Sequence, residues 1–239
     1  MGDYREIAVR FGFRACWSTP IRDATGAVLG TVALYASEPR CPRPEEEQLL
    51  DLATQLAALA LERWRESEEL RYRAFHDPLT GLANRLLFLD RLEHALARVE
   101  RDGGLAVLFV DLDDFKRIND RLGHAAGDRA LQEVAQRLSR SVRAGDTVAR
   151  FAGDEFTVLL EGLTTLEEVE AVAERLLRAF DEPLDLGEAT VPIRLSIGGA
   201  LAGQAPYPDS GTVLLVADQA LYTAKRRGKN RAHVAEVKG

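Results

Sequence analysis

The chain is poor in cysteine, with only Cys16 and Cys41 among its 239 residues. Neither lies in a Cys/His spacing typical of a metal site, which argues against a zinc module of that kind. One disulfide stays possible, but such a low cysteine content is more typical of a reduced protein than of a disulfide-stabilised one. The scarcity therefore favours a cytoplasmic protein.

Long apolar runs and excess positive charge are missing too. No run reaches the roughly 18–20 apolar residues that span a bilayer, and no signal peptide opens the chain, so we expect no membrane segment in it. The 31 Lys and Arg are outnumbered by 38 Asp and Glu, and the net charge of −7 argues against nucleic acid as a partner. The apolar content of 46% is ordinary for a globular protein.

The most informative segment that is present spans residues 150–156 and reads Arg-Phe-Ala-Gly-Asp-Glu-Phe. Apolar residues on both sides predict a β-hairpin over about 148–160, with Asp154 and Glu155 at its tip. The small pair Ala152-Gly153 lets the backbone approach a ligand closely. Two adjacent exposed carboxylates can hold Mg²⁺ and, through it, a nucleoside triphosphate.

A second acidic segment, residues 110–119, follows an apolar strand predicted at 105–110. Asp111 ends the strand, and Asp113 and Asp114 lie where a helix begins. A carboxylate at a strand end suits Mg²⁺, and the amides of a helix N-terminus suit phosphate. Such a turn alone is more often a solvated cap, but with the hairpin it predicts two acidic tips on separate strands.

Helical and strand patterns alternate from Asp77 onward. They predict one more strand over 192–198 and helices over about 84–101, up to 123, 128–142, 165–180 and 212–227. Antiparallel pairing mixed with helices predicts an α+β domain.

Taken in order, these segments resemble the GGDEF family of diguanylate cyclases, with Ala152 in place of the first signature glycine. The resemblance covers about residues 76–235. It implies a fold like the nucleotidyl-cyclase palm, with a central, mainly antiparallel sheet flanked by helices. It also implies that Asp154 and Glu155 are catalytic. Asp111, Leu112 and Asp154 would bind Mg²⁺ or Mn²⁺, and the main-chain amides of Asp114, Phe115 and Lys116 would bind the triphosphate.

Asn119 and Asp128 have two explanations. Spacing alone favours helix caps, with Asn119 at a helix end before Gly123 and Asp128 at the start of the next helix. The resemblance instead assigns both residues to guanine, whose N–H edge a carboxylate can accept. The two roles are compatible.

The basic end of the last predicted helix carries Lys225 and Lys229. Cations there complement the helix dipole, which is sufficient by itself to explain them. The resemblance assigns both lysines to the β- and γ-phosphates. Arginine is common in the family where Lys229 stands, and lysine keeps the charge without the bidentate fork.

Two further segments enter through the resemblance. Arg143 and Asp146, with Arg175, match an inhibitory site for the product cyclic di-GMP, although a surface turn would also explain the first two. Residues 76–85 match the segment that opens the family's domain, and Pro78 and Gly81 in it favour a structural hinge.

The N-terminal part divides at its prolines. Residues 1–44 read as strands around a turn at 23–26 and resemble the C-terminal part of a GAF sensor domain, too short for a ligand pocket. Residues 45–76 predict a long linking helix, and residues 77–239 the GGDEF domain. The helix has residues at heptad spacing: Leu49, Leu52, Leu56, Leu59, Arg63, Glu66, Leu70 and Arg73. Packing on its own domain and pairing with a second helix as a coiled coil both explain this seam.

The leading functional hypothesis is therefore a homodimeric, Mg²⁺-dependent diguanylate cyclase that condenses two GTP into cyclic di-GMP, releases two pyrophosphates and is inhibited by its product. The alternative is a catalytically silent GGDEF module that serves as a receptor for GTP or cyclic di-GMP. Ala152 favours the alternative if that position needs a positive φ.

Overall fold

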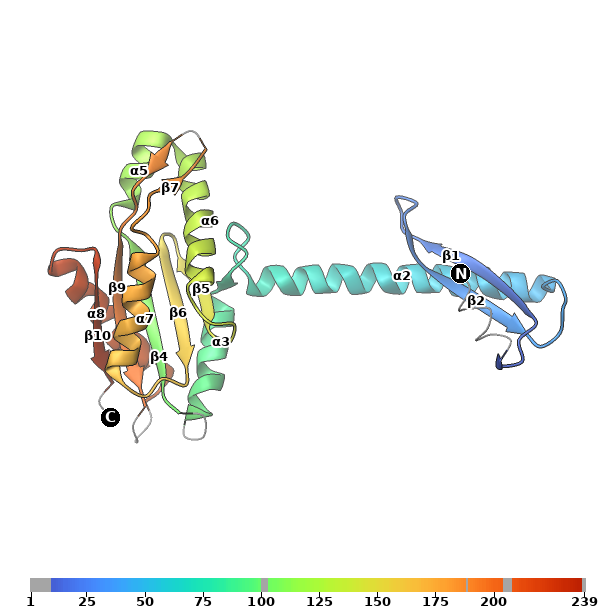
Figure 1. The fold of residues 1–239 in the computed structure, drawn as a ribbon. Helices are drawn as coiled ribbons and strands as arrows, with labels where there is room; N and C mark the ends of the chain where they lie inside the picture. The colour runs from blue at the N-terminus through green and yellow to red at the C-terminus, as the bar shows by residue number, and fades with distance from the viewer. Residues whose placement is uncertain (1–9, 100–102, 188, 204–207, 238–239) are drawn as a thin grey trace. The chain divides into compact units, whose positions relative to one another are not determined.

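The computed structural model describes residues 10–99, 103–187, 189–203 and 208–237. The chain forms two compact units, Met1–Tyr72 and Arg73–Gly239, and each is treated by itself (Figure 1). Residues 1–9 of the expected GAF-like segment lie outside the described residues. In the described parts of the chain, no helix combines the length and the apolar character needed to cross a membrane.

The first unit is a hairpin with a helix against it. Strands β1 (Ala15–Arg22) and β2 (Val28–Ala36) pair antiparallel, as the sequence predicts. The turn between them is held by Asp23, whose carboxylate accepts hydrogen bonds from the amides of Thr25 and Ala27. Helix α2 (Pro44–Phe75) follows and confirms the predicted long helix.

Two faces of α2 differ in what covers them. Leu50 is buried, and Ala53, Ala57 and Leu61 are half-buried on the same side of the helix. The leucines of the heptad seam are instead more than half exposed, at 55% for Leu49, 55% for Leu52, 58% for Leu56 and 54% for Leu59. The seam therefore does not pack on its own unit, and the first of its two explanations is wrong for these four leucines.

The second unit is built on a six-stranded sheet of order β10-β9-β4-β6-β5-β3. Its centre is antiparallel, and the outer pairs β10–β9 and β3–β5 are parallel. The strands are β3 (Ala83–Asn84), β4 (Leu105–Leu112), β5 (Thr147–Ala152), β6 (Glu155–Glu161), β9 (Leu195–Ala202) and β10 (Arg231–Glu236). This confirms the expected α+β fold with a mainly antiparallel sheet, to which the two outer pairs add parallel strands.

Helices cover both faces of this sheet (Figure 1). One core joins the sheet to α6 (His124–Arg140) and α7 (Leu166–Arg178) through side chains such as Leu138, Phe156 and Leu176. The other joins it to α3 (Arg85–Leu96) and α8 (Ser210–Arg226) through Phe88 and Leu221. The sheet is thus buried on both faces, which places functional groups at strand ends and in loops.

Several predicted boundaries differ from the structure. Helix α6 begins at His124, four residues before the predicted start, and β9 begins at Leu195 rather than at residue 192. Helix α3 ends at Leu96, short of residue 101. Helix α5 (Phe115–Leu122) ends where expected, but the short strands β7 (Leu184–Asp185) and β8 (Thr190–Val191), with β3 and β10, were not predicted. The two-residue strands β3, β7 and β8 carry too few residues for a clear apolar period.

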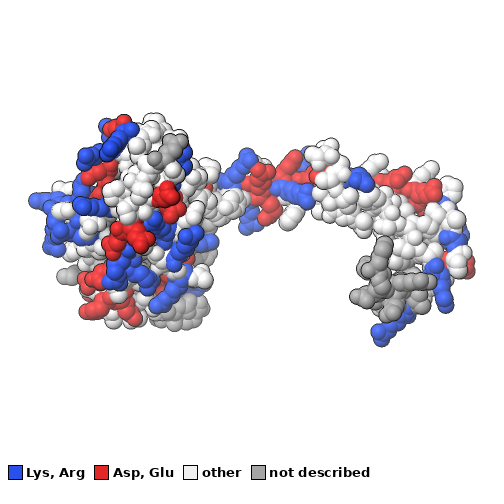
Figure 2. Space-filling model, turned by 45° about the horizontal axis from the view of Figure 1, so that its top comes forward, with Lys and Arg blue, Asp and Glu red and all other residues white. Residues whose placement is uncertain are grey.

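Charges do not separate by sign on the face of the second unit that Figure 2 shows, where basic and acidic side chains are interspersed. The mixed charges on this face therefore produce no strong field that would attract an anionic ligand from a distance, and specific contacts decide where such a ligand binds.

Candidate active site

The signature segment forms a tight hairpin between β5 and β6. Ala152 pairs with Glu155, which leaves Gly153 and Asp154 as a two-residue turn. Gly153 has a φ of 51°, as the first central residue of a type II′ turn requires. Ala152 is not among the described non-glycine residues with positive φ. The position therefore accepts alanine without backbone strain, and the feature that favoured a silent module is removed.

Strand pairing brings the second acidic segment to this turn. Asp111 in β4 stands opposite Glu155 in β6 and opposite Ser196 in β9. Its side chain is largely buried, and Lys225 Nζ lies 2.7 Å from Asp111 Oδ2. The two acidic tips that the sequence predicts on separate strands therefore meet at one end of the sheet.

Burial and nearby negative charge raise the pKa of two carboxyl groups at this strand end, Asp111 and Glu155. Burial raises the pKa of Asp111, the Lys225 ammonium opposes this effect, and the nearby Asp154 carboxylate adds to it. Burial likewise raises the pKa of Glu155, and Asp111 contributes to the increase. The strand ends concentrate negative charge that a cation would neutralise.

The donors here are of the type that hard divalent cations prefer. Two carboxylates, Asp111 and Asp154, and the carbonyl of Leu112 supply oxygen atoms at the strand end and the turn. Among the described residues, no three or more His, Cys, Asp or Glu side chains are grouped closely enough to hold a metal ion together. A cation at this position would thus need the Leu112 carbonyl, and oxygen atoms from bound substrate or water, to complete its coordination.

The loop after β4 leads into α5 and is held from two sides. Asp113 accepts hydrogen bonds from the Ser196 hydroxyl, at 2.8 Å, and from the Asn230 amide, at 3.0 Å. Asp114, the residue before α5, has a left-handed φ of 60°. The amides of the first helical turn, at Phe115 and Lys116, have no partner inside the helix, which is the arrangement that accepts phosphate.

The two lysines expected at the phosphates both lie at this loop. Lys229 Nζ is 2.8 Å from Asp114 Oδ1, and this contact lowers the pKa of the Asp114 carboxyl and raises that of Lys229. Lys225, from the last turn of α8, contacts Asp111. Helix α8 and the loop after it thus deliver two cations to the acidic strand end, beyond what complementing the helix dipole would require.

Asn119 lies where α5 and α6 pack together, and Asp128 is an exposed residue of α6 that follows Gly127. A Cβ added to Gly127 would lie 1.9 Å from Asn119 Oδ1, so only glycine lets Asn119 reach this position. Because α6 begins at His124, Asp128 lies within the helix and does not cap it. The capping explanation is therefore wrong for Asp128.

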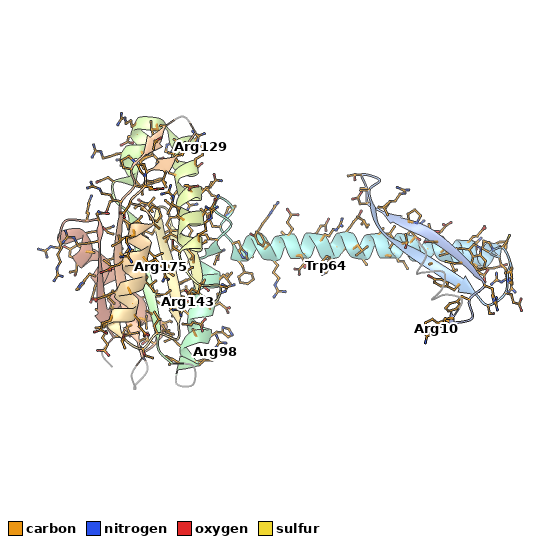
Figure 3. The ribbon with its side chains drawn as sticks, viewed as in Figure 1. Arg10, Trp64, Arg98, Arg129, Arg143 and Arg175 are labelled. Carbon is orange, nitrogen blue, oxygen red and sulfur yellow. The ribbon has the colours of Figure 1, made fainter. Side chains whose placement is uncertain are left out.

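The expected inhibitory residues lie at a separate place, around the start of β5 and on α7 (Figure 3). Arg143 and Asp146 form a turn in which the Arg143 amide donates to Asp146 Oδ2 at 2.9 Å. Arg175 Nε donates to the carbonyl of Ser141 at 2.8 Å. A cleft of about 540 Å³ brings together four arginines: Arg140, Arg143, Arg175 and Arg178.

Sequence reasoning missed two of these four arginines. Arg140 precedes Arg143 by three residues, and Arg178 follows Arg175 by three. Helical spacing to Arg175 on α7 could have indicated Arg178. Arg143 lies beyond the end of α6 at Arg140, so no helical period links those two. Asp146 does not line this cleft but an adjoining one, which it shares with Arg143.

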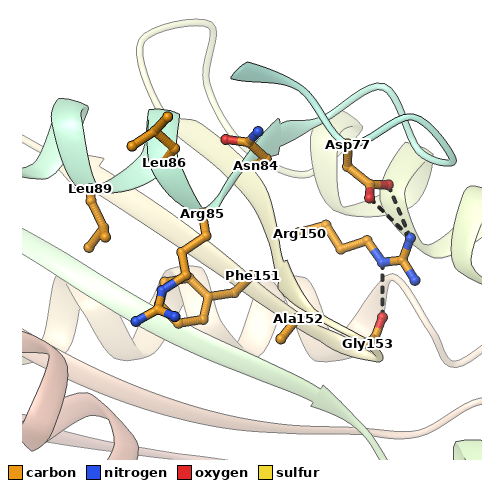
Figure 4. A pocket seen from close by; sticks show the side chains of 9 residues that line it. All are labelled: Asp77, Asn84, Arg85, Leu86, Leu89, Arg150, Phe151, Ala152 and Gly153. Atoms are coloured by element: carbon orange, nitrogen blue, oxygen red, sulfur yellow. Dashed lines mark hydrogen bonds and ion pairs between the residues drawn. The ribbon is translucent and has the colours of Figure 1, made fainter. Parts of the chain in front are cut away.

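Arg150, the first residue of the signature segment, was also missed. Its guanidinium contacts both carboxylate oxygens of Asp77, at 3.1 and 3.2 Å, and its Nε donates to the carbonyl of Gly153 at 2.9 Å (Figure 4). Burial raises the pKa of Asp77, but hydrogen bonds from Thr80 and Arg150 outweigh this and lower it overall. The segment expected to be only a hinge is thus bonded through Arg150 to the signature turn.

This geometry agrees with what comparison with known proteins shows. The family described as "Diguanylate cyclase, GGDEF domain" matches residues 74–231, and the GAF domain family matches residues 2–61. The chain belongs to the GGDEF family and carries part of a GAF domain before it.

Named relatives point to the same class. The diguanylate cyclase TpbB of Pseudomonas aeruginosa is 40% identical over 210 residues, which are 84% of this chain and 48% of TpbB. The solved GGDEF domain of TpbB has a TM-score of 0.63 at 42% identity and covers 68% of this chain and 95% of that one. The coiled coil and GGDEF domain of DgcB from Caulobacter crescentus, in complex with c-di-GMP, has a TM-score of 0.69 at 30% identity and covers 78% and 99%. The chain spans about half the length of TpbB.

Proposed function

We propose that the chain is a diguanylate cyclase that forms cyclic di-GMP and two pyrophosphates from two GTP. The observation that supports this most is the meeting of Asp111, Glu155 and Lys225 beside an unstrained signature turn. Incubating the purified chain with GTP and Mg²⁺ and separating the nucleotides by chromatography tests it. A chain that binds GTP without forming product is the silent receptor, and the proposal then fails.

Each residue has a role that its position allows. Asp111, Leu112 and Asp154 would hold Mg²⁺ or Mn²⁺, which supplies charge stabilisation at the phosphates when bound. The amides of Asp114, Phe115 and Lys116, with Lys225 and Lys229, would bind the triphosphate, because free helix amides and ammonium groups complement its charge. Asn119 and Asp128 would read guanine, and Glu155 would assist catalysis at the turn.

The reaction needs two GTP held with the 3′-hydroxyl of each facing the α-phosphorus of the other, so one domain supplies half of a site. We assign the pairing of two chains to the exposed leucine seam of α2. Four leucines that are more than half exposed on one side of a helix are an unfavourable surface for a lone chain. Their heptad spacing is that of a two-stranded coiled coil.

Product inhibition is expected at the arginine cleft. Arg143→Ala should raise the concentration of added cyclic di-GMP that halves the rate by roughly tenfold, because an arginine fork that binds phosphate or guanine is lost. The uninhibited rate should stay near wild type, since none of the residues placed at GTP lines this cleft. Initial rates at increasing cyclic di-GMP measure both quantities. Arg10→Ala, an exposed arginine of the other unit, is the control. Equal sensitivity in all three proteins would refute the assignment.

The contacts of Arg150 predict coupling between the Asp77 segment and the signature turn. Arg150→Met and Asp77→Asn should each lower kcat about tenfold, and the double variant should lose little more, with a coupling energy on the order of 1 kcal/mol. The reason is that either change removes the ion pair that orients the guanidinium toward the Gly153 carbonyl. Losses that simply add in the double variant would show that the two residues act separately.

The matched control is Arg85→Met. Arg85 lies near the same cleft of about 600 Å³, but its guanidinium stands over the ring of Phe151, 4.9 Å from the ring centre, and does not contact Asp77 (Figure 4). This variant should keep a kcat close to wild type, whereas Arg150→Met should not.

A further inference from the structure

A second cleft lies on the outer side of α5, about 720 Å³ in volume. It lies between α5 and the chain that runs through β8 into β9, at the end of the domain where Figure 1 shows α5 and β7. Three arginines line it: Arg117, Arg121 and Arg194. Its apolar lining comes from Ile118, Leu122, Val191 and Pro192.

Helix α5 separates this cleft from the residues placed at guanine. Phe115 and Asn119 face α6, since both lie beside Gly127. Arg117 and Arg121 are one helical turn apart and line the other side, and no residue of α6 is among the lining residues of the cleft. The cleft is thus a separate place from the expected base site.

The guanidinium groups of the three cleft arginines are available to bind a ligand. Among the described residues, none of the three guanidinium groups makes a hydrogen bond or an ion pair, and Arg117 acts on Asp114 only through space. Three acids also line the cleft, but Asp113 is bonded to Ser196 and Asn230, and Asp114 to Lys229. Of these acids only Asp114 has a cationic partner within the described parts of the chain, so Asp113 and Asp120 keep their charges; the three arginines exceed these two carboxylates by one, and the cleft attracts anions.

Arginines beside apolar side chains suit a ligand that carries both phosphate groups and a flat ring. Guanidinium forks match phosphate oxygens, and the apolar residues offer a surface for a flat ring. The volume lies within the range of pockets that hold one small organic molecule. We propose that this cleft is a second nucleotide site, which takes a nucleoside phosphate as effector; it borders the GTP site at Asp114, but its arginines lie outside that site.

The cleft is joined to the catalytic loop through Asp113. The Asp113 amide donates to the carbonyl of Arg194 at 2.9 Å, and the Ser196 hydroxyl donates to the Asp113 carboxylate. A phosphate that draws Arg194 and Arg117 together therefore acts on the loop that carries Asp111 and Asp114. Binding at the cleft changes the affinity for GTP, and GTP changes the affinity of the cleft by the same factor.

The probe is ADP, which carries phosphates without a guanine edge, titrated by calorimetry into the full chain with the GTP site filled by 3′-deoxy-GTP and Mg²⁺. Saturable binding is expected, and the double variant Arg121→Gln/Arg194→Gln should weaken it at least tenfold. Arg129→Gln, an exposed arginine on α6, should leave it unchanged.

Three results would overturn the proposal: no saturable binding of ADP, equal affinity in wild type and in the double variant, or equally strong binding of inorganic pyrophosphate, which would show that the apolar lining contributes nothing. The measurement does not depend on GTP turnover, so the proposal of a second nucleotide site can fail or hold whether or not the chain is an active cyclase. The double variant should retain the basal rate, because neither Arg121 nor Arg194 is placed at GTP.

Discussion

Asp154→Asn is expected to lower cyclic di-GMP formation on the order of a hundredfold or more, the scale of losing one preorganised electrostatic group. The carboxylate lies in the two-residue turn beside Asp111 and Glu155, where the charge that would hold a divalent cation is concentrated. The amide keeps the size of the side chain but removes its charge. Product formation from GTP at saturating Mg²⁺ measures the effect.

The fold should survive this change, because Asp154 is a turn residue and is absent from the two apolar cores. Its thermal melting temperature should match that of wild type within a degree or two, as expected for a substitution at a turn outside the cores. Asp181→Asn, an exposed acid after α7, is the control and should keep full activity. Wild-type turnover by Asp154→Asn would show that the cation is held elsewhere.

The double variant Leu52→Glu/Leu56→Glu is expected to dissociate the dimer and with it most of the activity. Each leucine gains roughly 1.5–3 kcal/mol when it is buried against a partner, so replacing two per chain with like charges should raise the dimer dissociation constant a hundredfold or more. Light scattering and rates measured over a range of protein concentrations would show it. Activity should return at high concentration, since each domain keeps its half of the site.

Asp51→Lys is the matched control for the seam. Asp51 is exposed on α2 but lies outside the heptad positions, so its change of charge should leave the dimer and the rate unaffected. A seam variant that stays dimeric, or that loses activity without dissociating, would remove α2 as the pairing element.

Local patterns were sufficient for much of the fold. The hairpin around Asp23, the long helix after the prolines and the strand with Asp111 near its end all appeared as predicted, because each depends on turn residues or on the apolar period of neighbouring positions. The start of α6 was wrong because Gly123 permits a new helix at once, with a φ of 82°. A propensity pattern cannot show such a junction.

The sequence by itself determined the family, the two acidic tips and the heptad leucines, since these are properties of residues close together in the chain. Only the tertiary structure decided that Asp111 stands opposite Glu155, that Arg150 joins Asp77 to Gly153, and that Arg194 completes a cleft with Arg117 and Arg121. It also decided that Ala152 is unstrained and that the leucine seam is exposed. The physical reason is that strand register and helix packing set these contacts between residues far apart in the chain, and no local period records them.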